Sequence, residues 1–370
     1  MLNRDKTFLS TIFAVTAPTE TDPVAKACVY LAHSKGSAGE LIQFFATQEI
    51  MASATENTLF RLNSVSSKMF KFYSKLGKSF VLCSKFISNF ALLVGTKYLY
   101  FTLALVINEL NIVAQKAAEA AEKISDGDDE KKASLLNFEM EIDPTKIKDA
   151  NIDIDQNVFQ LAAACQKIFS AVKTGSDKVP MEFRQIFQRI SYSIMDKYGS
   201  DDAVMKAVGG MLFLRFITPA LTAPQYYGLL QSPPNTVAQR KLVLLGKVLQ
   251  NLANMTTLGA KEQVMNNFED FMQRNIPKMR QLYMALLDPA TPFNQKMKLE
   301  LPVPENVRLN SLAMMHTHIF RNETKIRNAL QSLPDEERAH SMTAVLNDII
   351  GKYGEPPKKA KEKNVEASKG

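Results

Sequence analysis

The chain has 370 residues, of which 46% are hydrophobic, and a formal net charge of +7 at pH 7. This length allows one large helical domain or two ordinary ones, with enough apolar residues for a sizeable core. Acidic and basic residues are interspersed, so no nucleic-acid-binding stripe is indicated, and the charge suits an acidic protein surface or an anionic membrane. The 3 cysteines and 4 histidines form no paired or ligand-like pattern, which predicts neither disulfides nor a metal site.

The first part of the chain is predicted to be helical. Residues 1–50 form helices that a break at Gly36–Gly39 divides. A further helical stripe follows at positions i, i+4, i+7 and i+11, formed by Val65, Met69, Phe72 and Leu76. Asn63 or Ser64 is its expected N-cap. Arg61 therefore stands in a short polar loop at a helix entry, where an arginine is ordinarily a solvated surface charge.

Two apolar segments have features of membrane signals. Phe8–Ala17 is interrupted by hydroxyl residues, which is weak for a signal peptide. Phe86–Ile107 contains only one charged residue, Lys97, and is long enough to span a bilayer.

The rest of the chain also follows helical spacing. No segment alternates with period two for long enough to form a strand, and no repeat appears. We therefore expect an all-α fold of mostly antiparallel helices without a sheet, in one domain over residues 1–350 and a disordered Lys/Glu-rich tail over 351–370. The later helices are predicted at Val158–Val172, from Pro180 onward, and at Val237–Met255, Leu309–Leu330 and Ser341–Ile350.

The stretch Val208–Leu221 is an almost unbroken apolar run and predicts a buried helix, which Pro219 ends or kinks. Arg215 is the anomaly in this run. A buried guanidinium brings five donors that other groups must satisfy. The alternative is an arginine whose stem packs in the core while its charged head reaches water.

Enzyme motifs are absent from the sequence. It contains no Walker loop, no G-x-G-x-x-G after a strand, no H-E-x-x-H, no G-x-S-x-G and no kinase signature. An all-α chain without a nucleophile, metal site or phosphate cradle is expected to act on another protein.

Four blocks, in this order and spacing, resemble the Ras GTPase-activating protein (RasGAP) domain family. They are Thr58-Leu59-Phe60-Arg61, Phe213-Leu214-Arg215-Phe216-Ile217-Thr218-Pro219-Ala220, Gln250-Asn251-Leu252-Ala253-Asn254 and Gly259-Ala260-Lys261-Glu262. Residues Glu139 to Lys146 also resemble the family's E-x-D-P-x-K connection. The similarity covers most of residues 1–330, and the second block is highly specific.

The resemblance implies an all-helical activator, not itself an enzyme, that binds a GTP-bound Ras-family small GTPase and needs no cofactor or metal. Arg61 matches the family's arginine finger, and Arg215 matches the arginine that hydrogen-bonds the finger loop and holds it in place. Residues expected to contact the GTPase are Phe60, Leu214, Asn254 and Lys261. A cytoplasmic location follows from this role, with at most peripheral recruitment to the cytosolic face of the plasma membrane through the GTPase, and no nucleic-acid partner.

Two departures from the family pattern stand out. Thr218 occupies a position where the family often has Asn. Residues Gly77–Leu93 separate two segments that family members usually join directly, and this insertion creates the apparent membrane span. We interpret it as an unspliced intron carried into the translation, a hypothesis that transcript reads retaining these codons would contradict.

Two other functions remain open at this stage. An IQGAP-like scaffold would bind a GTPase without activating it, and the presence of Arg61 is what argues for activation. A membrane-embedded helical protein rests only on Phe86–Ile107. The sequence does not distinguish Ras, Rap or another GTPase as the partner.

Overall fold

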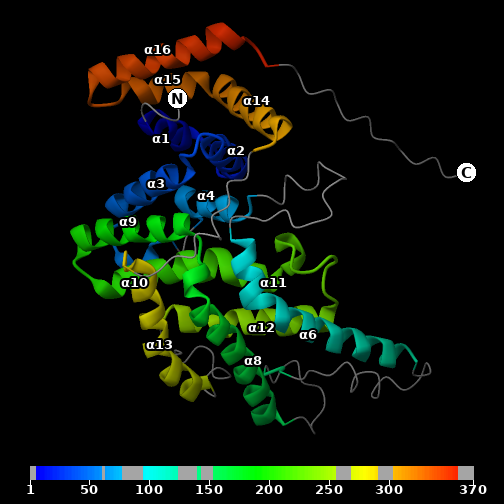
Figure 1. Ribbon diagram of the computed structural model, residues 1–370. Helices are drawn as coiled ribbons and strands as arrows, with labels where there is room; N and C mark the ends of the chain where they lie inside the picture. The colour runs from blue at the N-terminus through cyan, green and yellow to red at the C-terminus, as the bar shows by residue number, and fades with distance from the viewer. Residues whose placement is uncertain are drawn as a thin grey trace, which may run out of the picture.

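The computed structural model describes residues 6–60, 63–76, 95–123, 140–142, 153–255, 268–290 and 303–356 (Figure 1). Within these ranges every regular element is a helix, which confirms the predicted all-α class. Arg61, Lys261, the insertion at 77–93 and the end of the predicted tail lie outside the described residues.

Helices from the two ends of the chain pack together. α14 lies along α2, and α15 contacts α1, so the first and last helices form one side of the molecule (Figure 1). The bounds are α1 Lys6–Val15, α2 Thr21–His33, α3 Ala38–Ala52, α14 Glu305–Arg321, α15 Glu323–Gln331 and α16 Glu336–Tyr353. The buried imidazole of His318 joins these ends, because its Nε2 lies 2.9 Å from Thr16 Oγ1 and its Nδ1 lies 3.6 Å from Glu20 Oε2.

The prediction of one helix over Leu309–Leu330 was wrong. The chain forms α14 and α15 instead, with a break at Asn322. Both the main-chain N–H and the side-chain amide of Asn322 donate to the carbonyl oxygen of His318, at 3.1 and 3.0 Å. An asparagine side chain competes with the backbone for such bonds, which favours a helix end at this residue.

The central and lower helices form the rest of the core. α9 packs against α3, α10 and α13, and α12 packs against α6, α8 and α13 (Figure 1). The bounds are α4 Val65–Ser74, α6 Thr96–Glu122, α8 Ile154–Thr174, α9 Met181–Tyr198, α12 Thr236–Ala253 and α13 Glu269–Leu287, with short helices η1 Glu56–Thr58, η2 Ser176–Lys178 and η4 Pro224–Tyr227.

A continuous helix runs through the apolar stretch that contains Arg215. It consists of α10 Asp201–Gly209, the π-helical segment η3 Gly210–Ile217, and α11 Thr218–Thr222. The helix does not end at Pro219, but continues to Thr222. Proline removes one hydrogen bond of an α-helix and clashes with the preceding turn. Here that loss falls where the wider π winding changes back to α, so the helix tolerates it.

The ring of Phe216, in η3, lies at the centre of an aromatic cluster. It stacks on Tyr98 at a centroid distance of 6.2 Å and meets Phe183 edge-on at 5.1 Å. Gly95 has φ +101°, and a Cβ atom there would stand 2.6 Å from the Phe216 ring. Only glycine fits at this position, so the segment that follows residues 77–94 packs directly on the most specific sequence block.

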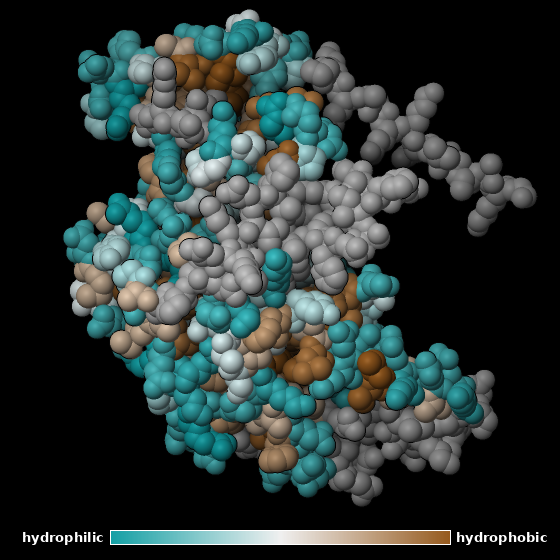
Figure 2. All heavy atoms as spheres, in the orientation of Figure 1, coloured by the Kyte–Doolittle hydropathy of each residue, from teal (hydrophilic) through white to brown (hydrophobic). Residues whose placement is uncertain are grey.

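Two described helical stretches, Lys97–Glu122 and Asp201–Thr222, are long and apolar enough to cross a membrane by length and composition alone. In Asp201–Thr222, 72% of the apolar window is buried inside the fold, so core packing accounts for its composition. In α6 half of the window is buried, and apolar side chains show on the surface in the region of this helix (Figure 2). Phe101 and Leu105 are among the exposed apolar residues of α6. Part of the predicted span Phe86–Ile107 lies outside the described residues.

Candidate functional site

The segment that connects α3 to α4, residues 53–64, is called the α3–α4 loop here, and both of its ends are fixed. At its start, Lys197 Nζ donates to three main-chain carbonyls at the end of α3, those of Ile50 (2.8 Å), Met51 (2.8 Å) and Ser53 (2.6 Å). At its end, Ser64 caps α4 by accepting a hydrogen bond from the Ser67 N–H at 3.3 Å. The predicted N-cap at Asn63 or Ser64 is therefore Ser64. The loop runs between two immobilised helix ends.

Phe60 has an unusual conformation immediately before Arg61. Its φ is +56°, in the left-handed region that a bulky L-residue rarely adopts. Such a residue costs on the order of 1–3 kcal/mol and persists only where the surroundings hold it. The ring of Phe60 is fully buried, and its N–H and its C=O are both hydrogen-bonded. The surroundings therefore impose the backbone direction in which the chain enters Arg61.

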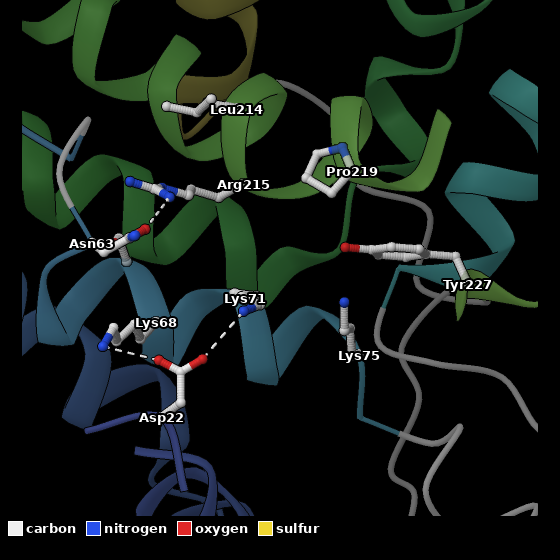
Figure 3. Close-up of a pocket in the computed structure, with 10 residues that line it drawn as sticks. Asp22, Asn63, Lys68, Lys71, Lys75, Leu214, Arg215, Pro219 and Tyr227 are labelled. Carbon is white, nitrogen blue, oxygen red and sulfur yellow. Dashed lines mark hydrogen bonds and ion pairs between the residues drawn. The ribbon is translucent and has the colours of Figure 1, made fainter. Parts of the chain in front are cut away.

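Arg215 holds the loop on both sides of Arg61. Its Nε and Nη2 donate to the carbonyl oxygen of Phe60 at 3.2 and 3.1 Å. Its Nη1 donates to Asn63 Oδ1 at 3.1 Å (Figure 3). Burial lowers the pKa of the guanidinium and the charge of Glu49 opposes that effect, but arginine starts so high that it stays protonated at neutral pH. The guanidinium of this half-buried arginine thus binds the loop at Phe60 and at Asn63, the residues before and after positions 61 and 62.

Glu49, in the last turn of α3, is a second anchor that was not predicted from the sequence. Its Oε1 accepts a hydrogen bond from the Phe60 N–H at 3.0 Å, and its Oε2 accepts one from the Ser66 hydroxyl. A signal was present, because a negative charge in the last turn of a helix opposes the helix dipole unless a partner compensates it. Glu49 and Arg215 hold the two sides of the same peptide unit of Phe60.

The π winding of η3 determines which side chains face the loop. Gly210 to Phe213, Phe216 and Ile217 are buried, whereas Leu214 and Arg215 are only partly buried. π segments widen a helix by one residue per turn and are frequent at functional sites. This segment presents Leu214 and Arg215 as a pair toward the surface while the rest of the run packs in the core.

The described parts of the sequence blocks meet in space. The Thr218 hydroxyl donates to Gln250 Oε1 at 3.3 Å, which joins the second and third blocks. A Cβ atom at Gly209 would lie 2.6 Å from both the Ala253 carbonyl oxygen and the Tyr283 hydroxyl, so α10 approaches the end of α12 as closely as glycine allows. The block at Gly259–Glu262 lies outside the described residues.

The expected GTPase contacts fall into three groups. Leu214 and Asn254, the C-cap of α12, are partly exposed and available to a partner. The prediction that Phe60 contacts the GTPase is corrected, because the side chain of Phe60 is buried in the core and offers no surface to a partner. Arg61 and Lys261 lie outside the described residues. Within the described ranges no group of three His, Cys, Asp or Glu side chains is placed to hold a metal ion.

The site is thus a single short loop, held by charged side chains on an all-helical body, with Arg61 between its two anchored residues in the sequence and no metal-ligand cluster in the described ranges. This arrangement defines a helical scaffold that fixes the backbone on both sides of one arginine. The family described as GTPase-activator protein for Ras-like GTPase matches residues 41–254, more than half of the chain. The chain belongs to this RasGAP family.

Curated relatives carry the same family name over longer chains. A probable Ras GTPase-activating-like protein, ngap, from Dictyostelium discoideum is 28% identical over 214 residues, 57% of this chain and 23% of the relative. The human Ras GTPase-activating protein nGAP is 24% identical over 286 residues, 77% of this chain and 21% of the relative. The human Ras GTPase-activating protein 1 is 29% identical over 140 residues, 38% of this chain and 13% of the relative. The chain spans less than a quarter of the length of these relatives.

Proposed function

We propose that this chain stimulates GTP hydrolysis by a GTP-bound small GTPase of the Ras family, with Arg61 as the residue that enters the partner's active site. One observation carries the proposal. The α3–α4 loop is anchored to the body at Phe60 and Asn63, on either side of the arginine, by Arg215 and Glu49. A surface charge of no consequence does not require a strained residue with both backbone groups bound beside it.

The chemistry of such a site is the placement of one charge. Negative charge develops on the phosphate oxygens as the γ-phosphoryl group departs, and a planar guanidinium in a water-excluded site stabilises it with bidentate hydrogen bonds. Anchoring the loop beforehand means that little reorganisation is needed during the reaction. Lysine lacks the fork of donors, so it does not replace arginine in this role.

The remaining residues have supporting roles in this proposal. Arg215 positions the loop, and Leu214, Asn254 and Lys261 contact the switch regions of the GTPase. The chain supplies a catalytic arginine in trans and needs no cofactor or metal of its own. It works in the cytoplasm and reaches the cytosolic face of the plasma membrane only through the bound GTPase.

Single-turnover hydrolysis of GTP by a panel of Ras, Rap and other small GTPases tests the proposal. In Ras with its activating protein the arginine finger is worth on the order of 10³–10⁵ in rate, a value measured on that system and not worked out from this structure. We expect Arg61→Ala to remove most of the stimulation by this chain while GTPase binding persists, and Arg61→Lys to restore little of it. Stimulation of no GTPase by the wild-type chain would refute the proposal, and binding without stimulation would identify a scaffold instead.

A further inference from the structure

A pocket of about 250 Å³ adjoins the α3–α4 loop, between α4, η3 and η4 (Figure 3). Three lysines of α4 and its C-terminal end, Lys68, Lys71 and Lys75, line its lower side in this view, with Arg215 and Tyr227 across from them. The volume is below the roughly 300–1,000 Å³ of sites for small-molecule ligands. It is large enough for a side chain of another protein.

The lining carries a surplus of positive charge. Among the described lining residues four side chains are cationic and one, Asp22, is a carboxylate, which is a formal charge of +3. Asp22 is itself engaged, at 2.9 Å from Lys68 Nζ and 3.4 Å from Lys71 Nζ. Cationic groups converging on one concave surface attract an anionic partner, and the low-dielectric walls strengthen that field.

The hydroxyl of Tyr227 gives a second and independent indication of a ligand. Tyr227 is fully buried, its hydroxyl points toward the interior of the pocket in Figure 3, and no hydrogen-bond partner for it is found among the described residues. Burial raises the pKa of this hydroxyl, so it remains a donor at neutral pH. Lys75 Nζ lies 4.6 Å from the centre of the same ring. An O–H donor beside an ammonium group is the pair that a carboxylate accepts, in two charge-assisted hydrogen bonds.

The position of the pocket identifies the source of the carboxylate. Asn63, Leu214 and Arg215 line the pocket, and Asn63 and Arg215 also form the anchor of the α3–α4 loop. A protein that docks on the loop therefore covers the mouth of the pocket. We infer that the pocket receives an Asp or Glu side chain of the GTPase, held by Lys75 and Tyr227, and that this contact helps to select the GTPase. The inference rests on the proposed function and adds a specificity-determining contact to it.

Variants of the two residues separate this contact from the chemistry at Arg61. Tyr227→Phe removes only the hydroxyl, and Lys75→Gln removes the ammonium group and its charge while keeping a polar side chain. The control is Lys26→Gln, because Lys26 also lies over a tyrosine ring, that of Tyr30 at 5.5 Å, but is absent from the pocket lining. Thermal melting of each variant checks that the fold is retained.

The measurement is single-turnover GTP hydrolysis as a function of chain concentration, at two salt concentrations, with the GTPase that the wild-type chain stimulates most. We expect Lys75→Gln and Tyr227→Phe each to raise the half-saturating concentration about tenfold, the factor for loss of one charge-assisted hydrogen bond, with a smaller salt dependence for Lys75→Gln. The effect falls on the half-saturating concentration rather than on the rate at saturation, and Lys26→Gln behaves as wild type. Replacing surface Asp and Glu residues of the GTPase one at a time should reveal one whose loss is not additive with Lys75→Gln.

The outcomes distinguish the two proposals. If the wild-type chain stimulates no GTPase, the proposed function fails and the inference falls with it. If stimulation is present but the two pocket variants keep the wild-type half-saturating concentration, only the inference is overturned. It is also overturned if the variants lose affinity for inorganic phosphate or for phosphatidylserine vesicles while their half-saturating concentration for the GTPase is unchanged, because the pocket then serves a different anion.

Discussion

Replacing Arg215 by alanine removes, among the described residues, two hydrogen bonds to the carbonyl oxygen of Phe60 and one to Asn63. The two bonds to Phe60 share one acceptor, so they count together as the satisfaction of a buried carbonyl, which is worth about 1–3 kcal/mol. The bond to Asn63 is exposed and adds up to about 1 kcal/mol. We therefore expect Arg215→Ala to lower the free energy of unfolding by about 2–4 kcal/mol.

Arg215→Ala should also lower the rate of stimulated hydrolysis, because it releases the backbone of Phe60. With its carbonyl released, Phe60 can leave the left-handed conformation and relax its backbone strain, which turns the chain at Arg61 away from the partner. If about 2 kcal/mol of the anchoring is lost, the anchored state becomes roughly 30-fold less populated, and the rate at saturation falls by about that factor. Arg215→Lys keeps the charge but not the fork, so we expect an intermediate rate.

Single-turnover hydrolysis at saturating chain concentration measures this effect, and urea unfolding measures the stability. A double variant gives the sharper test. If Arg215 acts only by positioning Arg61, then Arg61→Ala with Arg215→Ala should hydrolyse GTP no more slowly than Arg61→Ala alone. Equal rates for wild type and Arg215→Ala, or strictly additive losses in the double variant, would refute the positioning role.

Three further changes probe the supports of the site. Glu49→Gln keeps an acceptor for the Phe60 N–H but removes its charge, so the rate of stimulated hydrolysis at saturation should fall about tenfold. Gly209→Ala places a Cβ atom 2.6 Å from the Tyr283 hydroxyl and from a main-chain oxygen, and should destabilise the fold by about 1–3 kcal/mol in urea unfolding. Burial lowers the pKa of His318 below its ordinary value of about 6.5, so the unfolded chain binds the proton more readily, and stability should fall as the pH drops below that value.

Each of these changes has a control. Glu40→Gln alters an exposed carboxylate at the other end of α3 and should leave the rate unchanged. Gly351→Ala lies in α16 with no heavy atom within 4 Å of the added carbon, and should be neutral or stabilising. His318→Gln should flatten the loss of stability between about pH 7 and pH 5. A Gly209→Ala variant as stable as wild type, or a pH profile that His318→Gln does not change, would contradict the corresponding packing argument.

The sequence predicted the helices well wherever an apolar stripe recurs at helical spacing, as in α4, α9 and α12. It failed at Asn322, where one side-chain amide divides a stretch whose apolar periodicity continues through it. It also predicted that Pro219 ends or kinks its helix, whereas the helix continues to Thr222, because the rule for proline assumes α winding before it and composition gives no sign of a π segment.

The candidate site was predictable only in part. Arg215 stood out because a charge within an apolar run needs partners, and the resemblance indicated where those partners lie. Glu49 carried only the weak signal of a negative charge near a helix end, and Tyr227 carried none, because the partners of both residues are set by the fold. Glu49 lies 11 residues before Phe60 along the chain, and Tyr227 faces Lys75 across the pocket from a different helix. Phe60 was misjudged for a related reason, since its place in a polar loop does not reveal that the fold buries its ring.

The π segment makes the length of its helix critical. An α-helix turns about 100° per residue, so deletion of one residue between Gly210 and Ile217 would restore ordinary winding and rotate all that follows relative to α10. This helix makes a contact with α12 on each side of the π segment. Gly209, before the segment, packs against the carbonyl oxygen of Ala253, and Thr218, after it, donates a hydrogen bond to Gln250. The extra residue of the π winding allows both contacts to form and turns Arg215 outward toward the α3–α4 loop. A substitution can therefore be absorbed here more readily than a change in residue count.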